Sequence, residues 1–288
     1  MRVRPDMRRY ASAAWICALC IGAIGFTGCD MVVPPEEETR LDNPRDPVSP
    51  TTHIPPETTI ASGPANGSTI TTSTVTITYE SNADLFQTRL NAGAWSTWSS
   101  DTSTTLTYLD EVQYSFDVRA AYEPGEGEPT VFDGTPASVT FTVDAVSGPS
   151  LRFSPSFREV NQGSEFVLEL IAEEVSDLMA VRATVQFDPD VLTAIDVTEG
   201  SFLTSTGGSQ ALYYTIDDAN GVLEIDIGTA AGSPAGVTGS GTIATLTFRG
   251  DTQNEIDVTF DLSETAFRDS NNQPIVISNL VGARVRVR

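Results

Sequence analysis

Two acidic side chains have the spacing that paired-carboxylate chemistry requires. Glu224 and Asp226 are two residues apart in an alternating segment, so on a strand they share one face at a separation of about 7 Å. That separation suits the carboxylate pair of an inverting glycosidase. A strand on an open sheet face has no cleft, however, and neither carboxyl group is then buried enough to act as a general acid. We therefore expect no catalysis from this pair.

The residue types of other common catalytic and metal sites are scarce. The 288-residue chain has one histidine, His53, three cysteines and no lysine. Neither folded region can therefore contain a Ser-His-Asp triad, a Cys-His pair, a Schiff-base lysine or a His/Cys metal cluster. The acidic loops at Asp217-Asp218 and Asp269–Asn272 lack EF-hand spacing, so we interpret them as solvated turns. The sequence predicts no enzyme, no cofactor and no metal site.

The charge balance is strongly acidic. Asp and Glu number 39, whereas all 16 basic residues are arginine, which gives a formal net charge of −23 at pH 7. A surface of this sign repels the phosphate backbone of DNA or RNA. Nucleic acid is therefore excluded as a partner.

The chain begins with a basic stretch followed by an apolar one. Residues 1–10 contain several arginines, and residues 11–28 are apolar or small throughout. This pattern is typical of a secretory signal peptide. An uncleaved membrane anchor is the alternative, because the apolar run approaches membrane-spanning length.

The end of this stretch reads Phe26-Thr27-Gly28-Cys29 and resembles a bacterial lipobox, whose cysteine is acylated and becomes the new N-terminus. The resemblance implies a lipoprotein signal peptide at 1–28 and lipidation at Cys29. The other two cysteines precede Cys29 and would leave with the signal. We expect a bacterial cell-envelope protein that is anchored in the lipid membrane through acylated Cys29 and faces the periplasm or the exterior.

Composition then divides the rest of the chain. Residues 29–57 are rich in Pro and Glu without an apolar period, which indicates an extended, semi-rigid linker. His53 lies in it, and we interpret it as a solvated residue. A second break at 145–150 separates two folded regions, 58–145 and 150–288. Their β-branched residues and short alternating segments predict an all-β protein with two β-sandwiches.

The region 58–145 predicts an antiparallel sandwich of about seven strands. Its alternating apolar positions are Val75, Ile77 and Tyr79; Phe86; Tyr114, Phe116, Val118 and Ala120; and Val139, Phe141 and Val143. The opening Pro55–Ile60 and the run from Leu109 through Tyr114 to Ala120 resemble bacterial immunoglobulin-like and fibronectin type III-like modules. The resemblance implies a tyrosine corner, in which the Tyr114 hydroxyl bonds to nearby backbone.

Two tryptophans stand in the segment Trp95-Ser96-Thr97-Trp98-Ser99. The spacing matches a motif of cytokine receptors, in which it forms a structural ladder outside the binding site. We favour two Trp side chains that pack on an adjacent strand. A platform on which sugar rings stack is the alternative.

The region 150–288 predicts a nine-stranded jelly roll. Candidate strands lie near 151–153, 165–173, 179–187, 193–198, 211–217, 222–228, 242–249, 256–262 and 281–287. Leu223, Ile225 and Ile227 alternate with the two acids named above, and Ala244, Leu246 and Phe248 alternate with threonines. We expect these apolar positions to face the core.

The same region resembles cohesins, the modules by which cellulosome scaffoldins hold dockerin-bearing enzymes. The resemblance is carried by Gly163, Phe187-Asp188-Pro189-Asp190-Val191-Leu192, Gly200, Asp217 through Asn220-Gly221, and Gly239 through Phe248. It implies a non-catalytic module that binds a dockerin-like protein. Carbohydrate-binding modules share the fold, so the fold alone does not choose the ligand.

Cohesins recognise dockerin through a flat sheet face that includes the strand before the Asp-Pro turn. The corresponding outward positions here are Ala180, Arg182, Thr184 and Gln186, beside Glu224 and Asp226. These six residues are our candidate partner-binding face. The Asn/Asp pair of the best-known cohesin type is missing, so a divergent partner stays open, and Arg182 is either a solvated residue or a partner contact.

These patterns together predict a non-catalytic cell-surface lipoprotein. Its cohesin-like module would bind a dockerin-type protein or a polysaccharide, in a system linked to polysaccharide breakdown. A carbohydrate-binding protein and a structural envelope spacer are the alternatives.

Overall fold

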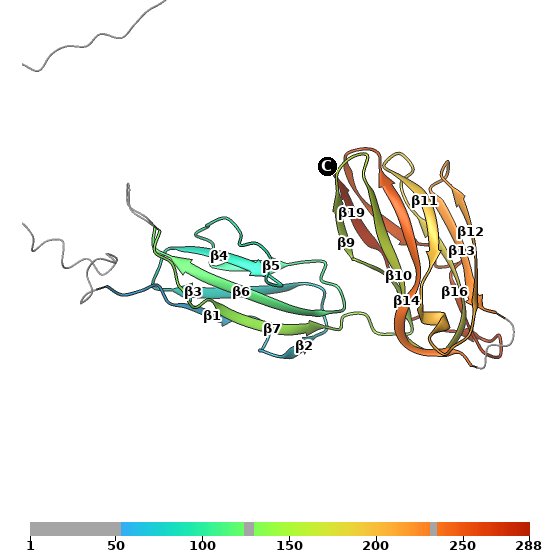
Figure 1. Cartoon of the computed structure of the whole chain (residues 1–288), viewed down its shortest axis with the longest axis horizontal. Helices are drawn as coiled ribbons and strands as arrows, with labels where there is room; N and C mark the ends of the chain where they lie inside the picture. The colour runs from blue at the N-terminus through green and yellow to red at the C-terminus, as the bar shows by residue number, and fades with distance from the viewer. Residues whose placement is uncertain (1–52, 124–129, 231–234) are drawn as a thin grey trace, which may run out of the picture.

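The computed structural model describes residues 53–123, 130–230 and 235–288. Within these ranges the regular structure is β-strand, apart from a single 3-10 turn at Phe202–Thr204. No helix in them has the length and apolarity needed to cross a membrane. The expected signal peptide at 1–28, Cys29 and most of the linker lie outside the described residues. The described chain forms two neighbouring β-sandwiches, whose strands run in different directions (Figure 1).

The first sandwich contains seven strands in two sheets. One sheet has the order β1 (Thr58–Ser62), β3 (Val75–Ser81) and β5 (Ser103–Leu106), and the other has β2 (Ser68–Ile70), β7 (Ala137–Val143), β6 (Gln113–Ala121) and β4 (Leu85–Leu90). The pairing is antiparallel except between β2 and β7, which run parallel. The expectation of an antiparallel sandwich therefore fails at this one pair.

The core of this sandwich consists of the alternating positions expected from the sequence. Ile77, Phe116 and Phe141 are at most 1% exposed, because the two sheets face each other across them. The hydroxyl oxygen of Tyr114 accepts a hydrogen bond from the backbone N–H of Asp110 at 2.8 Å. This is the tyrosine-corner contact, and it fixes the chain that enters β6.

The end of the expected linker packs on the first sandwich. The hydroxyl of Tyr122 donates to the backbone oxygen of Ile54 at 2.6 Å, and the side-chain amide of Asn82 donates to the backbone oxygen of Pro55 at 3.0 Å. His53, just before them, is half-buried rather than fully solvated. Hydrogen bonding to the sandwich thus begins a few residues before β1.

The second sandwich contains more strands than the nine expected. They are β8 (Ser150–Ser154), β9 (Phe157–Val160), β10 (Glu165–Gln186), β11 (Leu192–Glu199), β12 (Gln210–Asp217), β13 (Val222–Thr229), β14 (Val237–Gly250), β15 (Asn254–Phe260), β16 (Ala266–Asp269), β17 (Pro274–Ile275), β18 (Asn279–Val281) and β19 (Ala283–Val287). Strands such as β9, β16 and β17 are two to four residues long, which is too short for their alternation to show in the sequence.

The long strand β10 joins the two layers of this sandwich. Its first half pairs with β14 and β8, and its second half pairs with β13 and β16. The sequence predicts two strands here, whereas the structure has one strand with register shifts near its middle. Glu174 and Asp177 have positive φ values of 49° and 58° at this point, which turn the strand from one layer to the other.

The core of the second sandwich confirms the alternation in the sequence. Leu223, Ile225 and Ile227 are at most 2% exposed, and so are Ala244, Leu246 and Phe248. Residues between them point outward. The layer formed by β12, β13, the second half of β10 and β16 thus has one face on the core and one face on the surface.

Candidate functional site

The candidate partner-binding residues come from neighbouring strands of one layer. Arg182 on β10 is the partner of Asp226 on β13, and Thr184 is the partner of Glu224. Beyond them, Tyr213 on β12 pairs with Asp226, and Ala266 on β16 pairs with Arg182. We call the outward side of these four strands the β10 face.

The structure brings the six predicted residues together but does not expose all of them. Arg182, Gln186, Glu224 and Asp226 are exposed, and Ala180 is half-buried. Thr184 is 6% exposed, so its assignment as a contact residue is wrong.

The segment 261–265 lies beside Thr184 and hydrogen-bonds to its backbone. The backbone N–H of Thr184 donates to the hydroxyl of Thr265 at 3.4 Å, and its backbone oxygen accepts from the N–H of Asp261 at 2.8 Å. This segment follows β15 and closes against β10. The Thr184 hydroxyl is buried without a hydrogen-bond partner, so it is a packing residue rather than a recognition residue.

The charges on the β10 face are weakly engaged with each other. Arg182 Nε lies 3.9 Å from Asp226 Oδ1, and the two side chains are 48% and 58% exposed. An exposed ion pair at this distance contributes at most about 1 kcal/mol to stability. Arg268 on β16 is also exposed, with one long hydrogen bond to a backbone oxygen at 3.5 Å. These groups are available to a partner at little cost to the fold.

Sequence reasoning missed two exposed apolar side chains at this site. Tyr213 is 74% exposed beside Asp226, and Leu262 is 73% exposed in the segment that hydrogen-bonds to the Thr184 backbone. The alternation of the strand predicted at 211–217 could have placed Tyr213 outward. No local pattern places Leu262 near β10, because its position depends on how the chain folds back after β15.

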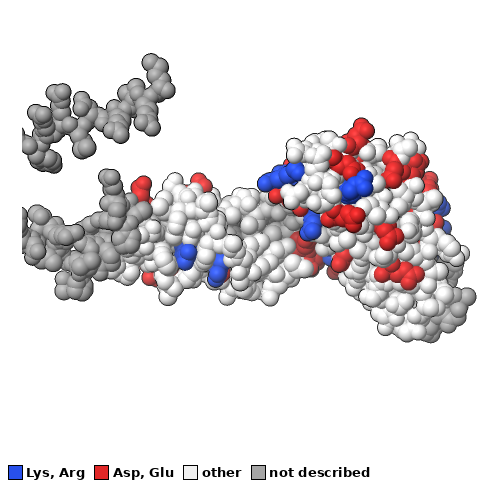
Figure 2. All heavy atoms as spheres, turned by 45° about the horizontal axis from the view of Figure 1, so that its top comes forward, with Lys and Arg blue, Asp and Glu red and all other residues white. Residues whose placement is uncertain are grey.

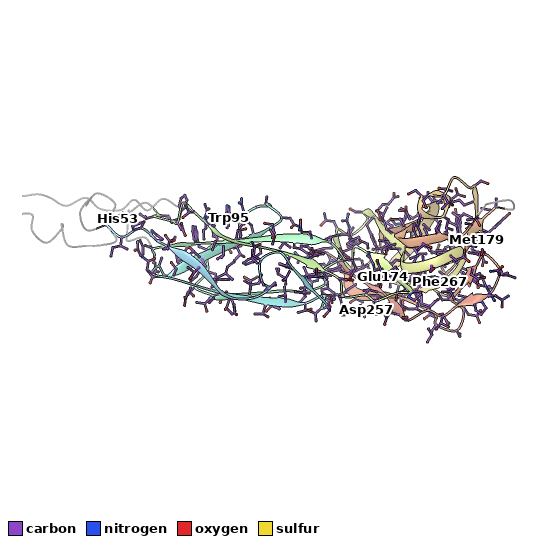
Figure 3. All side chains as sticks on the ribbon, turned by 90° about the horizontal axis from the view of Figure 1, so that it is seen from below. His53, Trp95, Glu174, Met179, Asp257 and Phe267 are labelled. Atoms are coloured by element: carbon purple, nitrogen blue, oxygen red, sulfur yellow. The ribbon has the colours of Figure 1, made fainter. Side chains whose placement is uncertain are left out.

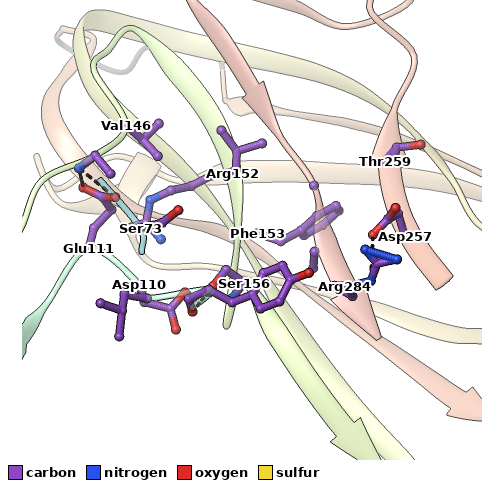
Figure 4. Close-up of a pocket in the computed structure, with 16 residues that line it drawn as sticks. Ser73, Asp110, Glu111, Val146, Arg152, Phe153, Ser156, Asp257, Thr259 and Arg284 are labelled. Carbon is purple, nitrogen blue, oxygen red and sulfur yellow. Dashed lines mark hydrogen bonds and ion pairs between the residues drawn. The ribbon is translucent and has the colours of Figure 1, made fainter. Parts of the chain in front are cut away.

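The carboxylates Glu224 and Asp226 lie on this open surface. A pocket of about 450 Å³ is formed elsewhere, at the joint between the two sandwiches (Figure 4). The charged group that pairs with the Asp226 carboxylate is the exposed Arg182 guanidinium, and a nearby cation favours the ionised form of an acid. The arrangement supports recognition by charge and surface contact, and it gives neither carboxyl group the surroundings of a general acid.

The joint pocket is built from contacts that connect the sandwiches. Asp110 accepts a hydrogen bond from the backbone N–H of Ser156 at 2.7 Å, and the Ser156 hydroxyl donates to the backbone oxygen of Tyr108 at 2.6 Å. The rings of Tyr108 and Phe157 stack at 5.5 Å. Burial raises the pKa of Asp110, because the carboxylate loses water at the joint. These groups hold the two sandwiches together.

The tryptophans form a second surface cluster, on the first sandwich. The guanidinium carbons of Arg89 and Arg119 lie 4.4 and 4.3 Å from the ring centroid of Trp95. The expectation that the rings pack on an adjacent strand is confirmed for Trp95, because Arg89 belongs to β4 and Arg119 to β6. Trp95 lies at the surface, in the half of the sandwich away from the joint (Figure 3).

Comparison with known proteins finds one family. Residues 155–280 match the family model of the cohesin domain. No curated protein sequence matches the chain. Cohesins are non-catalytic modules, which agrees with the expectation that this region is not an enzyme.

Solved structures similar to this chain include three cohesins. A non-cellulosomal cohesin from the archaeon Archaeoglobus fulgidus is 16% identical, with 48% of this chain and 90% of that chain covered and a TM-score of 0.40. A chain of a type I cohesin–dockerin complex from Clostridium thermocellum is 12% identical, with 48% of this chain and 98% of that chain covered and a TM-score of 0.41. A type II cohesin domain from the cellulosome of Acetivibrio cellulolyticus is 14% identical, with 46% of this chain and 94% of that chain covered and a TM-score of 0.40. The family match thus assigns residues 155–280, within the second sandwich, to the cohesin domain.

Proposed function

We propose that this protein is a non-catalytic surface lipoprotein whose cohesin domain binds a dockerin-like protein module through the β10 face. The family match over residues 155–280 is the observation that carries the proposal. Cohesins bind dockerins, and the β10 face contains the strand that this recognition uses.

The surface chemistry of the β10 face supports protein recognition. Tyr and Arg are the residue types most enriched among side chains that dominate binding energy, and Tyr213 and Arg182 are both exposed here. Their positions on β12 and β10 are fixed by continuous strand pairing. A partner would therefore meet a preorganised surface and pay little conformational entropy on that side.

The anchor is the other part of the proposal. Acylation of Cys29 would hold the protein in the membrane, and the Pro- and Glu-rich stretch after it would separate the sandwiches from the lipid. Figure 2 shows acidic side chains spread over the second sandwich among fewer arginines. That surface would be repelled by anionic headgroups, which suits a domain displayed at a distance from them.

Two alternatives differ in what the β10 face does. In one, the second sandwich binds a polysaccharide in a system that degrades it. In the other, both sandwiches are spacers of the cell envelope and the face binds nothing.

The test is direct titration of the purified chain with a panel of dockerin modules by isothermal calorimetry, alongside soluble polysaccharides. We expect at least one dockerin to bind saturably, and we expect no polysaccharide to compete with that dockerin. Binding of polysaccharide alone, at a site that Arg182→Glu weakens, would favour the first alternative and contradict the proposal. Absence of heat with every dockerin and every glycan would favour the spacer.

A pair of charge-reversed variants assigns the binding to the β10 face. Arg182→Glu changes an exposed residue of the face, and Arg158→Glu makes the same change at an exposed residue of β9. The proposal expects a weaker complex only for the first variant. Equal affinities for both variants would move the site away from β10.

A further inference from the structure

The first sandwich gathers its positive charges and its tryptophans at one place. Arg89 and Arg119 are the only arginines between residues 53 and 149, and lysine is absent from the chain. They lie on the neighbouring strands β4 and β6, and both guanidinium groups lie over Trp95. We call Arg89, Arg119, Trp95, Trp98 and Phe132 the Trp–Arg cluster.

Backbone pairing holds the tryptophan segment against β4. The N–H of Ser96 donates to the backbone oxygen of Thr88 at 2.9 Å, and Phe86 and Ser99 exchange backbone hydrogen bonds of 2.7 and 3.0 Å. The rings therefore lie beside the outward residues of β4 and β6. The cluster is a built surface of the sheet rather than a pair of side chains on a free loop.

Arg119 is surrounded by aromatic rings. Its guanidinium carbon lies 4.3 Å from the centroid of Trp95, 5.6 Å from that of Trp98 and 4.5 Å from that of Phe132. Phe132 is 47% exposed. The cation thus stands among apolar ring faces that also reach the solvent.

The two arginines differ in how their charge is balanced. Arg89 Nε pairs with Asp117 at 2.7 Å. Arg119 instead donates from Nε and Nη2 to the neutral side-chain oxygen of Gln87, at 3.1 and 2.8 Å. Within the described residues no carboxylate pairs with Arg119, and its Nη1 is neither hydrogen-bonded nor buried.

The surroundings of Arg119 therefore favour an added anion. Burial among the rings and the nearby Arg89 guanidinium lower the pKa of Arg119, because both disfavour its positive charge. A carboxylate at the open edge of the guanidinium would neutralise that charge and accept the remaining N–H groups in a two-point contact.

We propose that the Trp–Arg cluster is a second binding site, which takes a carboxylated polysaccharide by placing a uronate carboxylate on Arg119 and the adjoining sugar ring against Phe132. An aromatic ring packs well on the apolar C–H face of a sugar, and the guanidinium reads the acid group. A neutral glycan lacks the carboxylate, and an acidic peptide lacks the rigid apolar ring face. This site is independent of the proposed dockerin-binding face.

The net charge of −23 does not prevent such binding. At physiological salt, charges are screened beyond about 8 Å, so the charge of Arg119, which no carboxylate of the described residues balances, decides the contact. The long-range repulsion lowers the rate of encounter instead.

Polygalacturonate is the probe, and its fully methyl-esterified form is the neutral match with the same sugar backbone. Affinity electrophoresis of the whole chain through gels containing either polymer gives the two dissociation constants. We expect the acid form to bind at least about tenfold more tightly, since one charge-assisted contact is worth about that factor. Equal retardation by both polymers would overturn the proposal.

Variants then locate the contact. Arg119→Gln should lose about tenfold in affinity for polygalacturonate, whereas Arg158→Gln, which removes the same charge from β9, should leave affinity unchanged. Arg119→Lys keeps the charge but not the planar edge, and should lose several-fold. Unchanged binding by Arg119→Gln, or equal losses in Arg119→Gln and Arg158→Gln, would refute the site.

Two further measurements distinguish loss of this contact from unfolding and from peptide binding. Melting temperatures of the variants show whether a loss of affinity comes from unfolding. If Arg119→Gln unfolds, the affinity of Arg119→Lys for polygalacturonate tests the contact instead. Polyglutamate that competes as well as polygalacturonate would identify a peptide site and refute the sugar assignment. Arg182→Glu, on the other sandwich, should retain full polygalacturonate binding.

Discussion

Arg182 Nε lies 3.9 Å from Asp226 Oδ1 across the pairing of β10 and β13, and both side chains are about half exposed. The two charges are close enough to orient each other but too exposed to bind each other strongly. An incoming partner can therefore recruit either charge without breaking a buried ion pair. If the β10 face binds a partner as proposed, charge at this pair would determine specificity more than stability.

Charge reversal at Arg182 should separate binding from folding. Arg182→Glu places two acids side by side, so we expect the melting temperature to fall only slightly and the affinity for a dockerin partner to drop at least several-fold. Calorimetric titration and thermal denaturation of the same sample measure both quantities. A large fall in melting temperature with unchanged affinity would contradict this prediction.

Truncation at Tyr213 should have the same selective effect through apolar contact. Tyr213→Ala removes a side chain that is 74% exposed, so the expected loss is about 2 kcal/mol of binding free energy with little loss of stability. Tyr214→Ala is the matched control, because the Tyr214 hydroxyl donates to Asp196 and its side chain points to the other side of β12. Binding losses of equal size in both variants would argue against Tyr213 as an anchor.

The turn at Gly221 should tolerate no side chain. Its φ is +66°, and an added Cβ would lie 2.0 Å from the backbone oxygen of Phe187. Gly207 has a φ of +89° with no atom within 4 Å of an added Cβ. We expect Gly207→Ala to cost about 1–2 kcal/mol from backbone strain alone and Gly221→Ala to cost clearly more. Chemical denaturation curves compare the two, and equal costs would disprove the role of the Phe187 contact.

Asp133 should make the stability of the first sandwich depend on pH. Burial by itself would raise its pKa, but hydrogen bonds from Thr135 and Thr58 outweigh burial and lower it. A lowered pKa contributes stability above the unfolded value, about 3.9, and that stability is lost as the pH falls through the lower folded value.

The variant Asp133→Asn tests this sign. We expect it to be about 1–2 kcal/mol less stable than the wild type at pH 7, with the difference shrinking as the pH falls below about 4. Melting curves across this range give the comparison, with exposed Asp144→Asn as the control. A difference that grows on acidification would reverse the sign and refute the argument.

Cys29→Ala should abolish lipidation. Once residues 1–28 are removed, no other thiol remains, so the variant offers no acceptor for an acyl chain. Metabolic labelling with a palmitate analogue and membrane fractionation measure the result. Label that persists in the variant would contradict the lipoprotein proposal.

The alternation of apolar residues was sufficient to predict which side chains enter each core. Ile77, Phe116 and Phe141 in the first sandwich and Ile225 and Phe248 in the second are all buried as expected. The turn at Asn220-Gly221 likewise joins β12 and β13 as an antiparallel hairpin. Both signals are local, because strand period and turn chemistry depend on residues within a few positions.

The composition of the candidate sites was decided by tertiary structure. Thr184 alternates with Arg182 and so resembles an outward residue in the sequence, yet it is 6% exposed, and a segment about 80 positions later hydrogen-bonds to its backbone. Arg119 meets Trp95 only because β4 pairs with β6. The period of a strand determines the direction in which each side chain points. The exposure of that side chain depends on which distant segment packs near it, and long-range strand pairing sets the position of that segment.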